Sequence, residues 1–142
     1  MTDTMHPNLS IMNRLDIKNL DACADVFADN FVWHYINPKL PKIEGNYQGV
    51  SGLKSFFSKI SETGNGAFQV NPVDVRAVGD ELVFVQVCNQ LALDDGPIEF
   101  DAIVIWRIVD GKIAEAWDIP AVHTVRTVPQ SQSQDKNETA SS

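Results

Sequence analysis

The chain has 142 residues and a mass of 15.7 kDa, with 44% hydrophobic and 21% charged residues, a balance typical of one globular domain. Its formal net charge of −8 argues against nucleic acid and anionic membranes as partners. No apolar stretch is long enough to span a membrane, and the N-terminus lacks the pattern of a secretory signal. Cys23 and Cys88 lie in apolar segments, which predicts buried free thiols in a cytoplasmic protein.

The first half of the chain predicts two helical segments and one strand. Residues 1–8 are expected to be a flexible lead, and hydrophobic residues recur at helical spacing over 9–27, with a break near the middle. The segment 31–36, FVWHYI, is rich in aromatic and β-branched residues and predicts a short strand. After a loop rich in Pro and Gly, the stripe within 51–61 predicts an amphipathic helix with Ser51 as its N-cap.

The second half predicts an antiparallel meander. The predicted strands are 68–78, 82–93, 98–109 and 112–123. Pro72 indicates an edge position or a bulge, and the polar tail 126–142 is expected to be disordered. The separation of helices from strands indicates one α+β domain over 9–125, in which a strongly curved sheet wraps around the N-terminal helices. Such a cone would hold an apolar pocket for a small molecule.

The turn Val109-Asp110-Gly111-Lys112 decides which face of the sheet carries Asp118. A two-residue type I′ loop would pair Val104 with Trp117, whereas a three-residue loop with a left-handed Gly111 would pair Val104 with Ala116. We favour the three-residue loop, because its alanines leave an empty apolar volume on one face. The residues that this register gathers on that face are Ala102, Val104, Trp106, Ala114, Ala116 and Asp118.

The opposite face of the same hairpin predicts a contact between subunits. Its residues in the favoured register are Ile103, Ile105, Arg107, Ile113, Glu115 and Trp117. Arg107 would lie diagonally across from Glu115 and neutralise it, which gives Glu115 a structural role. We therefore expect a homodimer.

Three segments, FADNFVWH, EGNYQGVSGLKSFF and IVIWRIVDGKIAEAWD, together resemble the SnoaL-like branch of the nuclear transport factor 2-like superfamily. The resemblance covers about residues 9–125 and implies a cystatin-like roll. In SnoaL-type polyketide cyclases an aspartate on the final strand is the base of an intramolecular aldol closure, and the resemblance places that aspartate on Asp118. The cyclases' pocket histidine falls on Val104, and the base of the related ketosteroid isomerases falls near Tyr35, so these parts of the two sites are missing.

Two interpretations of Asp118 remain open. In a lined cavity it would be poorly solvated, which raises the pKa of a carboxyl group toward a value suited to removing a carbon-bound proton. Alternatively it ends its strand by accepting backbone hydrogen bonds before Pro120. His34 has two interpretations as well: the acid–base partner of Asp118, or a core histidine with one hydrogen bond.

The sequence therefore predicts a cofactor-independent enzyme that cyclises, isomerises or dehydrates a small hydrophobic carbonyl compound, with Asp118 and His34 as catalytic residues. The alternative is a non-catalytic ligand-binding or assembly domain of the same shape. The expected pocket-lining residues are Trp33, Tyr35, Tyr47, Asn89, Ala102, Val104, Trp106 and Ala116. No metal site is expected, since the three histidines lack ligand-like spacing.

Overall fold

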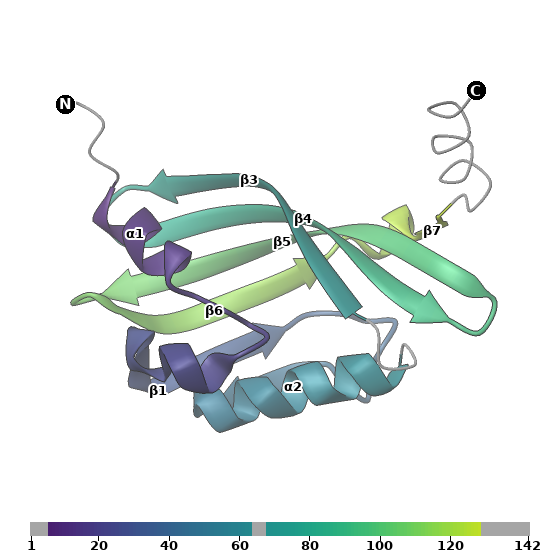
Figure 1. Ribbon diagram of the computed structural model, residues 1–142, viewed down its shortest axis with the longest axis horizontal. Helices are drawn as coiled ribbons and strands as arrows, with labels where there is room; N and C mark the ends of the chain where they lie inside the picture. Colours follow the sequence, from purple (N-terminus) through teal and green to yellow (C-terminus); the bar gives the residue numbers. More distant parts are fainter. Residues whose placement is uncertain (1–5, 64–67, 129–142) are drawn as a thin grey trace.

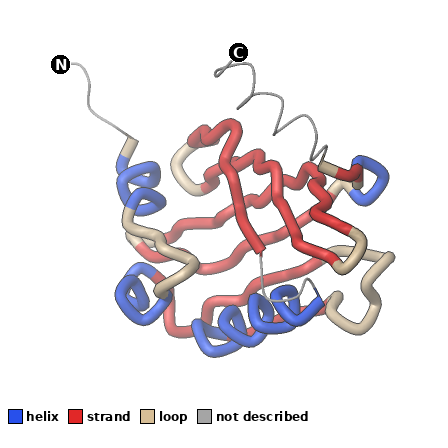
Figure 2. Tube along the Cα trace, turned by 45° about the vertical axis from the view of Figure 1, so that its right-hand side comes forward, coloured by secondary structure: helices blue, strands red, loops and turns tan. Residues whose placement is uncertain are grey.

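A curved, unclosed sheet with helices packed along one of its sides is the framework of the computed structural model (Figures 1 and 2). The structure describes residues 6–63 and 68–128. In chain order the elements are α1 (Pro7–Asn13), the 3-10 helix η1 (Leu20–Val26), β1 (Phe27–Tyr35), β2 (Gly45–Gln48), α2 (Gly49–Thr63), β3 (Phe68–Val78), β4 (Leu82–Leu93), β5 (Gly96–Val109), β6 (Lys112–Pro120), the 3-10 helix η2 (Val122–Thr124) and β7 (Arg126–Thr127). The predicted α+β class is confirmed.

The strand order in the sheet is β2-β1-β6-β5-β4-β3, and β7 adds to β5 beyond the end of β6. All neighbouring pairs are antiparallel except β1 and β6, which run parallel. This order brings β1, an early strand, beside β6, the strand that carries Asp118. Positions 33 and 35 of β1 therefore share the inner face of the sheet with positions 116 and 118 of β6.

The N-terminal helical region is broken, as the sequence predicts. α1 ends at Asn13, and η1 begins at Leu20 after a six-residue connection. η1 is a kinked 3-10 helix with non-helical dihedral angles at Cys23. Hydrogen bonds from His6 Nε2 to the Gly79 carbonyl and from Asn8 Nδ2 to the Asp80 carbonyl fasten the start of α1 to the β3–β4 turn. Pro7 and Asn8, which the sequence assigned to a flexible lead, therefore belong to α1, and residues 1–5 lie outside the described part of the chain.

Helix α2 supplies most of the packing against β1 and β2. Leu53, Phe56 and Ile60 are buried at helical spacing, which confirms the predicted apolar stripe. The helix begins earlier than predicted, at Gly49, whose φ of +72° suits a glycine at a sharp change of direction. Ser51 therefore lies inside the first turn and is not the N-cap. The strand β2, which leads into the helix, was not predicted.

The strands β3 and β4 have the predicted bounds, and both readings of Pro72 are confirmed. β3 lies at the edge of the sheet, and its register against β4 shifts between Pro72 and Asp74. An edge strand tolerates proline because proline has no backbone N–H to donate to a ladder. β6 is shorter than predicted, since it ends at Pro120 and the 3-10 helix η2 follows.

The last hairpin corrects the predicted three-residue loop. Its loop has two residues, Asp110 with φ +53° and Gly111 with φ +77°, and Val109 pairs with Lys112, which is a type I′ turn. A bulge follows: Ile108 pairs with Ile113 but Arg107 pairs with Glu115, so Ala114 is an extra residue. Val104 therefore pairs with Asp118, which neither predicted register gave.

In β6, the residues after Ala114 lie on the faces that were predicted for them, whereas Ile113 and Ala114 lie on the faces opposite to the predicted ones. Ala116 and Asp118 lie on the inner face with Val104, as expected, because the one-residue shift changes the alternation. Ile113 was predicted to face outward but is fully buried in the core. Ala114 leaves the inner face instead and is only half-buried.

The C-terminal end departs from the predicted disordered tail. Arg126 and Thr127 form β7 and pair with Glu99 and Ile98 of β5. The Arg126 guanidinium also forms ion pairs with Glu99 and Asp101. Residues 129–142 lie outside the described part of the chain.

Candidate functional site

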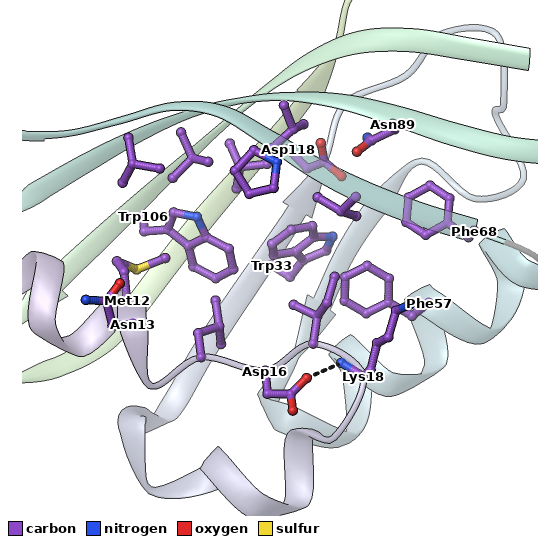
Figure 3. A pocket seen from close by; sticks show the side chains of 18 residues that line it. Met12, Asn13, Asp16, Lys18, Trp33, Phe57, Phe68, Asn89, Trp106 and Asp118 are labelled. Atoms are coloured by element: carbon purple, nitrogen blue, oxygen red, sulfur yellow. Dashed lines mark hydrogen bonds between the residues drawn. The ribbon is translucent and has the colours of Figure 1, made fainter. Parts of the chain in front are cut away.

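A cavity of about 400 Å³ lies between the inner face of the sheet and the N-terminal segment (Figure 3). Its lining residues are Met12, Asn13, Leu15, Asp16, Ile17, Lys18, Trp33, Phe57, Phe68, Val70, Pro72, Val75, Val85, Val87, Asn89, Val104, Trp106 and Asp118. Most of the wall is aliphatic or aromatic. Few polar groups interrupt it, which is the usual composition of a small-molecule site.

Two tryptophans form the flat part of the wall. The rings of Trp33 and Trp106 have centroids 5.3 Å apart and are tilted by 52°. Phe56 and Phe57 of α2 pack against Trp33 at 5.4 and 5.9 Å. The indole of Trp33 is thus held from several directions, and its orientation in the cavity is fixed by packing.

Asp118 is the buried carboxyl group of the cavity, with 8% of its surface exposed. Its side chain forms no hydrogen bond or ion pair with the residues that the structure describes. Burial is the cause of its altered titration: desolvation raises the pKa of Asp118 from an ordinary value of 3.8 to about 7. Near neutral pH the group therefore divides between carboxylate and carboxylic acid, and it can both accept and return a proton.

Two more polar atoms of the lining are buried. Within the described residues, neither the indole N–H of Trp33 nor Oδ1 of Asn89 has a hydrogen-bond partner. Trp33 is 2% and Asn89 5% exposed. A buried polar group without a partner costs roughly 1–3 kcal/mol, so such groups are rare in folded proteins. Asn89 is thus the inward-facing member of the polar pair Asn89-Gln90, while Gln90 bonds to Glu99.

His34 lies on the opposite face of the sheet from Asp118, which corrects its predicted role as the partner of that residue. Its Nε2 is 2.6 Å from Glu115 Oε2, and its Nδ1 is 2.7 Å from Asn46 Oδ1. Its ring stacks on Trp117 at 5.5 Å. Because side chains alternate along a strand, His34 points outward where Trp33 and Tyr35 point inward.

Four other predicted lining residues do not reach the cavity: Tyr35, Ala102 and Ala116, which are buried, and Tyr47, which is half-buried. The Tyr35 hydroxyl accepts a hydrogen bond from Asn37 Nδ2 at 2.8 Å, and burial raises its pKa to about 12. The Tyr47 hydroxyl donates to the Ile43 carbonyl. Val104, Trp106, Trp33 and Asn89 do line the cavity, as predicted.

Sequence reasoning missed the opposite wall. Met12, Leu15 and Ile17 come from α1 and the connection after it, and Phe57 and Phe68 come from α2 and β3. The signal was present in part, since Met12 and Leu15 belong to the apolar pattern of the broken helix. Amphipathic spacing shows that a residue faces inward, but it does not distinguish a packed core from a cavity wall.

Glu115 has the structural setting that the sequence predicts. Its carboxylate contacts His34, and Arg107 Nε lies 3.7 Å from its Oε1. Arg107 also pairs with Glu81 and lies over the Trp117 ring at 5.3 Å from the centroid. These residues form a polar network on the outer face, which is separated from the cavity by the sheet itself.

Within the described ranges 6–63 and 68–128, no three His, Cys, Asp or Glu side chains cluster in a way that could hold a metal ion. None of the helices in the same ranges is both long and apolar enough to cross a membrane. Both cysteines are free thiols, Cys23 buried and Cys88 half-buried.

The fold is the nuclear transport factor 2-like, cystatin-like α+β fold, with a cavity against the inner face of the curved sheet. A family model for the SnoaL-like domain matches residues 10–116, so this chain belongs to the SnoaL-like family. Among curated proteins, none matches the sequence.

Solved structures share the fold at low sequence identity. TerC, co-crystallised with polyporic acid, has a TM-score of 0.70 and 18% identity over 82% of this chain and 93% of its own. A nuclear transport factor 2-like protein of unknown function from Burkholderia pseudomallei has a TM-score of 0.70 and 14% identity, covering 84% of this chain and 94% of its own. A candidate polyketide cyclase from Bacillus cereus has a TM-score of 0.63 and 23% identity, covering 83% of this chain and 76% of its own. At these identities the likeness concerns the fold alone.

Proposed function

We propose that this protein is an acid–base enzyme that acts on a small hydrophobic carbonyl compound, with Asp118 as its general base. One observation carries the proposal: a carboxyl group stands in an apolar cavity, without a bonding partner among the described residues, and burial brings its pKa to about 7. A base with a pKa near the working pH is well matched to proton transfer. That TerC, a protein of the same fold, was co-crystallised with a small organic molecule is consistent with a ligand in such a cavity.

The proposed step begins with the Asp118 carboxylate and a carbon next to the substrate carbonyl. The carboxylate takes a proton from that carbon, the C–H electron pair becomes the C=C bond of an enolate, and the C=O π electrons move onto oxygen. In an isomerisation, Asp118 then returns its proton to another carbon. In a cyclisation, the enolate carbon attacks a second carbonyl of the same molecule and the new alkoxide takes the proton. In a dehydration, the proton leaves with a β-hydroxyl group as water.

The first half of this step can be measured without knowing the natural substrate. We use 2-tetralone, a bicyclic ketone with acidic C–H bonds, and follow deuterium incorporation in D₂O by NMR. The wild-type protein should accelerate the exchange above the buffer rate, and kcat/KM should rise with pH to half its maximum near pH 7, because the carboxylate is the active form. Asp118→Asn should abolish the acceleration.

His34→Gln is the matched control, because His34 lies on the outer face and glutamine keeps a hydrogen-bonding group beside Asn46 and Glu115. This variant should exchange 2-tetralone at the wild-type rate. Binding of 2-tetralone is followed separately through the fluorescence of Trp33 and Trp106 in the cavity wall. Binding without any exchange above buffer, or equal exchange by Asp118→Asn, would overturn the proposal.

A second candidate function is binding without catalysis, and one observation favours it. No described group orients the Asp118 carboxyl, whereas a catalytic base is usually held by a hydrogen-bonded neighbour. As a neutral acid, Asp118 would then donate a hydrogen bond to a ligand. In this case the protein binds 2-tetralone without exchange, and Asp118→Asn, which retains a donor, keeps most of the affinity.

We also propose a homodimer formed through the outer face of the sheet. Ile103, Ile105 and Trp117 are only half-buried in the single chain, and the neighbouring Ile36 and Ile119 are 42% and 40% exposed. A second copy that covers this face would remove these side chains from water, with the Arg107–Glu115–His34 network inside or beside the contact.

A further inference from the structure

Two buried atoms of the cavity, the indole N–H of Trp33 and Oδ1 of Asn89, lack a partner within the described residues and have no part in the chemistry of Asp118 described above. Both residues line the cavity that holds Asp118. Figure 3 shows the nitrogen edge of Trp33 turned toward the side of the cavity on which Asp118 and Asn89 lie. One donor and one acceptor thus face the same interior space.

Packing fixes the direction of the Trp33 indole, and the backbone pairing of β4 fixes the face on which Asn89 lies. The Trp33 indole is packed against Trp106, Phe56 and Phe57. Asn89 lies in the middle of β4, where its backbone pairs with Val70 of β3 and Phe100 of β5. Polar groups that are buried, oriented and unpaired are preorganised for a ligand, because binding needs no rearrangement to align them.

The tyrosine hydroxyl groups that the sequence predicts in the pocket already have hydrogen-bond partners. The Tyr35 hydroxyl takes a hydrogen bond from Asn37, and the Tyr47 hydroxyl donates to the Ile43 carbonyl. Neither tyrosine lines the cavity. With His34 on the outer face, the Trp33 N–H is a buried, oriented donor on the same inner face of the sheet as Asp118.

We propose that Trp33 Nε1 donates a hydrogen bond to a carbonyl oxygen of the ligand and that Asn89 Oδ1 accepts one from a ligand hydroxyl, so that the site selects a ketone that carries a hydroxyl group on an otherwise apolar frame. This inference rests on the proposed function in one respect: the carbonyl bound by Trp33 is the one whose neighbouring carbon Asp118 deprotonates. Negative charge that develops on that oxygen strengthens the Trp33 hydrogen bond in the transition state. The Asn89 contact concerns recognition alone.

The two proposed hydrogen bonds are tested with three bicyclic probes of similar size that carry different polar groups. Naphthalene has none, 2-tetralone has a carbonyl acceptor, and 2-naphthol has a hydroxyl group that can donate. Affinities are measured by NMR titration of the wild type, Trp33→Phe and Asn89→Leu. Trp33→Phe should weaken 2-tetralone about threefold to tenfold and leave naphthalene within about twofold. Asn89→Leu should weaken 2-naphthol by a similar factor and spare 2-tetralone.

Phe57→Leu is the matched control, because Phe57 lines the same cavity, packs against Trp33 and carries no polar side-chain atom. It should change the affinities for all three probes by a similar factor. In the deuterium-exchange assay, Trp33→Phe should lower kcat about tenfold or more with a smaller change in KM, as expected for a contact that strengthens in the transition state. A wall residue without a polar role would change KM instead.

The outcomes separate this inference from the proposed function. If no exchange is catalysed but the two variants discriminate between the probes as stated, the oxygen-binding pair stands and the enzyme proposal fails. If exchange depends on Asp118 but neither variant discriminates, ordered water satisfies Trp33 and Asn89 and this inference is wrong. Circular dichroism of each variant establishes that it is folded before either comparison is made.

Discussion

Asp118 is held in a setting that opposes its ionised form. The cavity wall around it is apolar, and no described residue donates a hydrogen bond or offers a cation to its carboxylate. A carboxyl group in water ionises near pH 4, whereas this group keeps its proton to about pH 7 because ionisation would place a charge in a poorly solvated space. The fold therefore loses stability as Asp118 ionises, and replacement of this residue should reveal the loss.

Asp118→Asn should stabilise the protein at high pH and have little effect at low pH. The folded state keeps the proton to about pH 7 and the unfolded state releases it near 3.8, so stability falls as the pH rises between these values. A difference of about three pKa units, at about 1.4 kcal/mol per unit, makes the effect at pH 8 as large as about 4 kcal/mol. Urea denaturation of both proteins at pH 4 and pH 8 measures it.

Equal free energies of unfolding for the wild type and Asp118→Asn at pH 8 would contradict the burial of the carboxylate. A destabilised variant at both pH values would instead indicate that Asp118 accepts structural hydrogen bonds, which is the second interpretation that the sequence left open. The comparison uses no ligand, so it tests the setting of Asp118 independently of turnover.

At the scale of elements, the β5–β6 hairpin decides which side chains meet the cavity. Its type I′ turn alone would pair Ile103 with Asp118 and turn the carboxyl outward. The bulge at Ala114 adds one residue to β6, so Val104 pairs with Asp118 and both face the cavity. A bulge next to a functional residue is a common way to aim one side chain without changing the sheet.

Two single-residue deletions test this account. Without Ala114 the hairpin becomes regular: Ile108 still pairs with Ile113 and Arg107 with Glu115, so every later residue keeps its face. This deletion should cost no more than about 1 kcal/mol of stability. Without Ala116 the regular hairpin places Glu115 opposite Trp106, on the inner face. Burial of that carboxylate should cost at least about 3 kcal/mol.

Thermal and urea unfolding of the two deletion proteins measures the difference between them. They lose the same residue type from the same strand, so the change in length and composition is matched. Similar destabilisation by both deletions would show that the bulge has no part in setting the faces of β6.

Patterns along single segments predicted the elements well, and contacts between distant segments accounted for the rest. The bounds of β3 and β4 follow from their β-branched residues and the turns between them. The sequence predicted the inward orientation of Asp118 correctly but assigned the wrong loop. A bulge and a three-residue turn each add one residue to the hairpin and exchange the faces of the strand in the same way, so the sequence does not distinguish them. The outward face of His34 depends on the parallel pairing of β1 with β6, which no local pattern reveals.

At the scale of the whole molecule, the sheet has two faces of different character. Asp118, Asn89 and Trp33 face the cavity, while His34, Glu115 and Arg107 form the ionic network on the other side. The ionic network lies beside half-buried apolar side chains, among them Ile105 and Trp117. This arrangement suits a contact between two copies, because the ionic pairs can fix the orientation of an otherwise apolar interface.

Ile105→Asp should convert the expected homodimer into a monomer, because it places a charge at the centre of the proposed contact. Light scattering at micromolar concentration measures the mass of the wild type and the variant. Val125→Asp is the control, since Val125 is 50% exposed and follows η2, outside the sheet. A monomeric wild type, or a variant that remains dimeric, would show that this face is not the interface.

The docking of α1 has a wider consequence. Hydrogen bonds from His6 and Asn8 attach this helix to the β3–β4 turn, and Met12, Leu15 and Ile17 line the cavity that holds Asp118. The surroundings of Asp118, near the end of the domain, thus depend on a short stretch about a hundred positions earlier in the chain. Variation in residues 12–17 alone can change the shape of the cavity, and with it the range of molecules that fit, while the sheet stays unchanged.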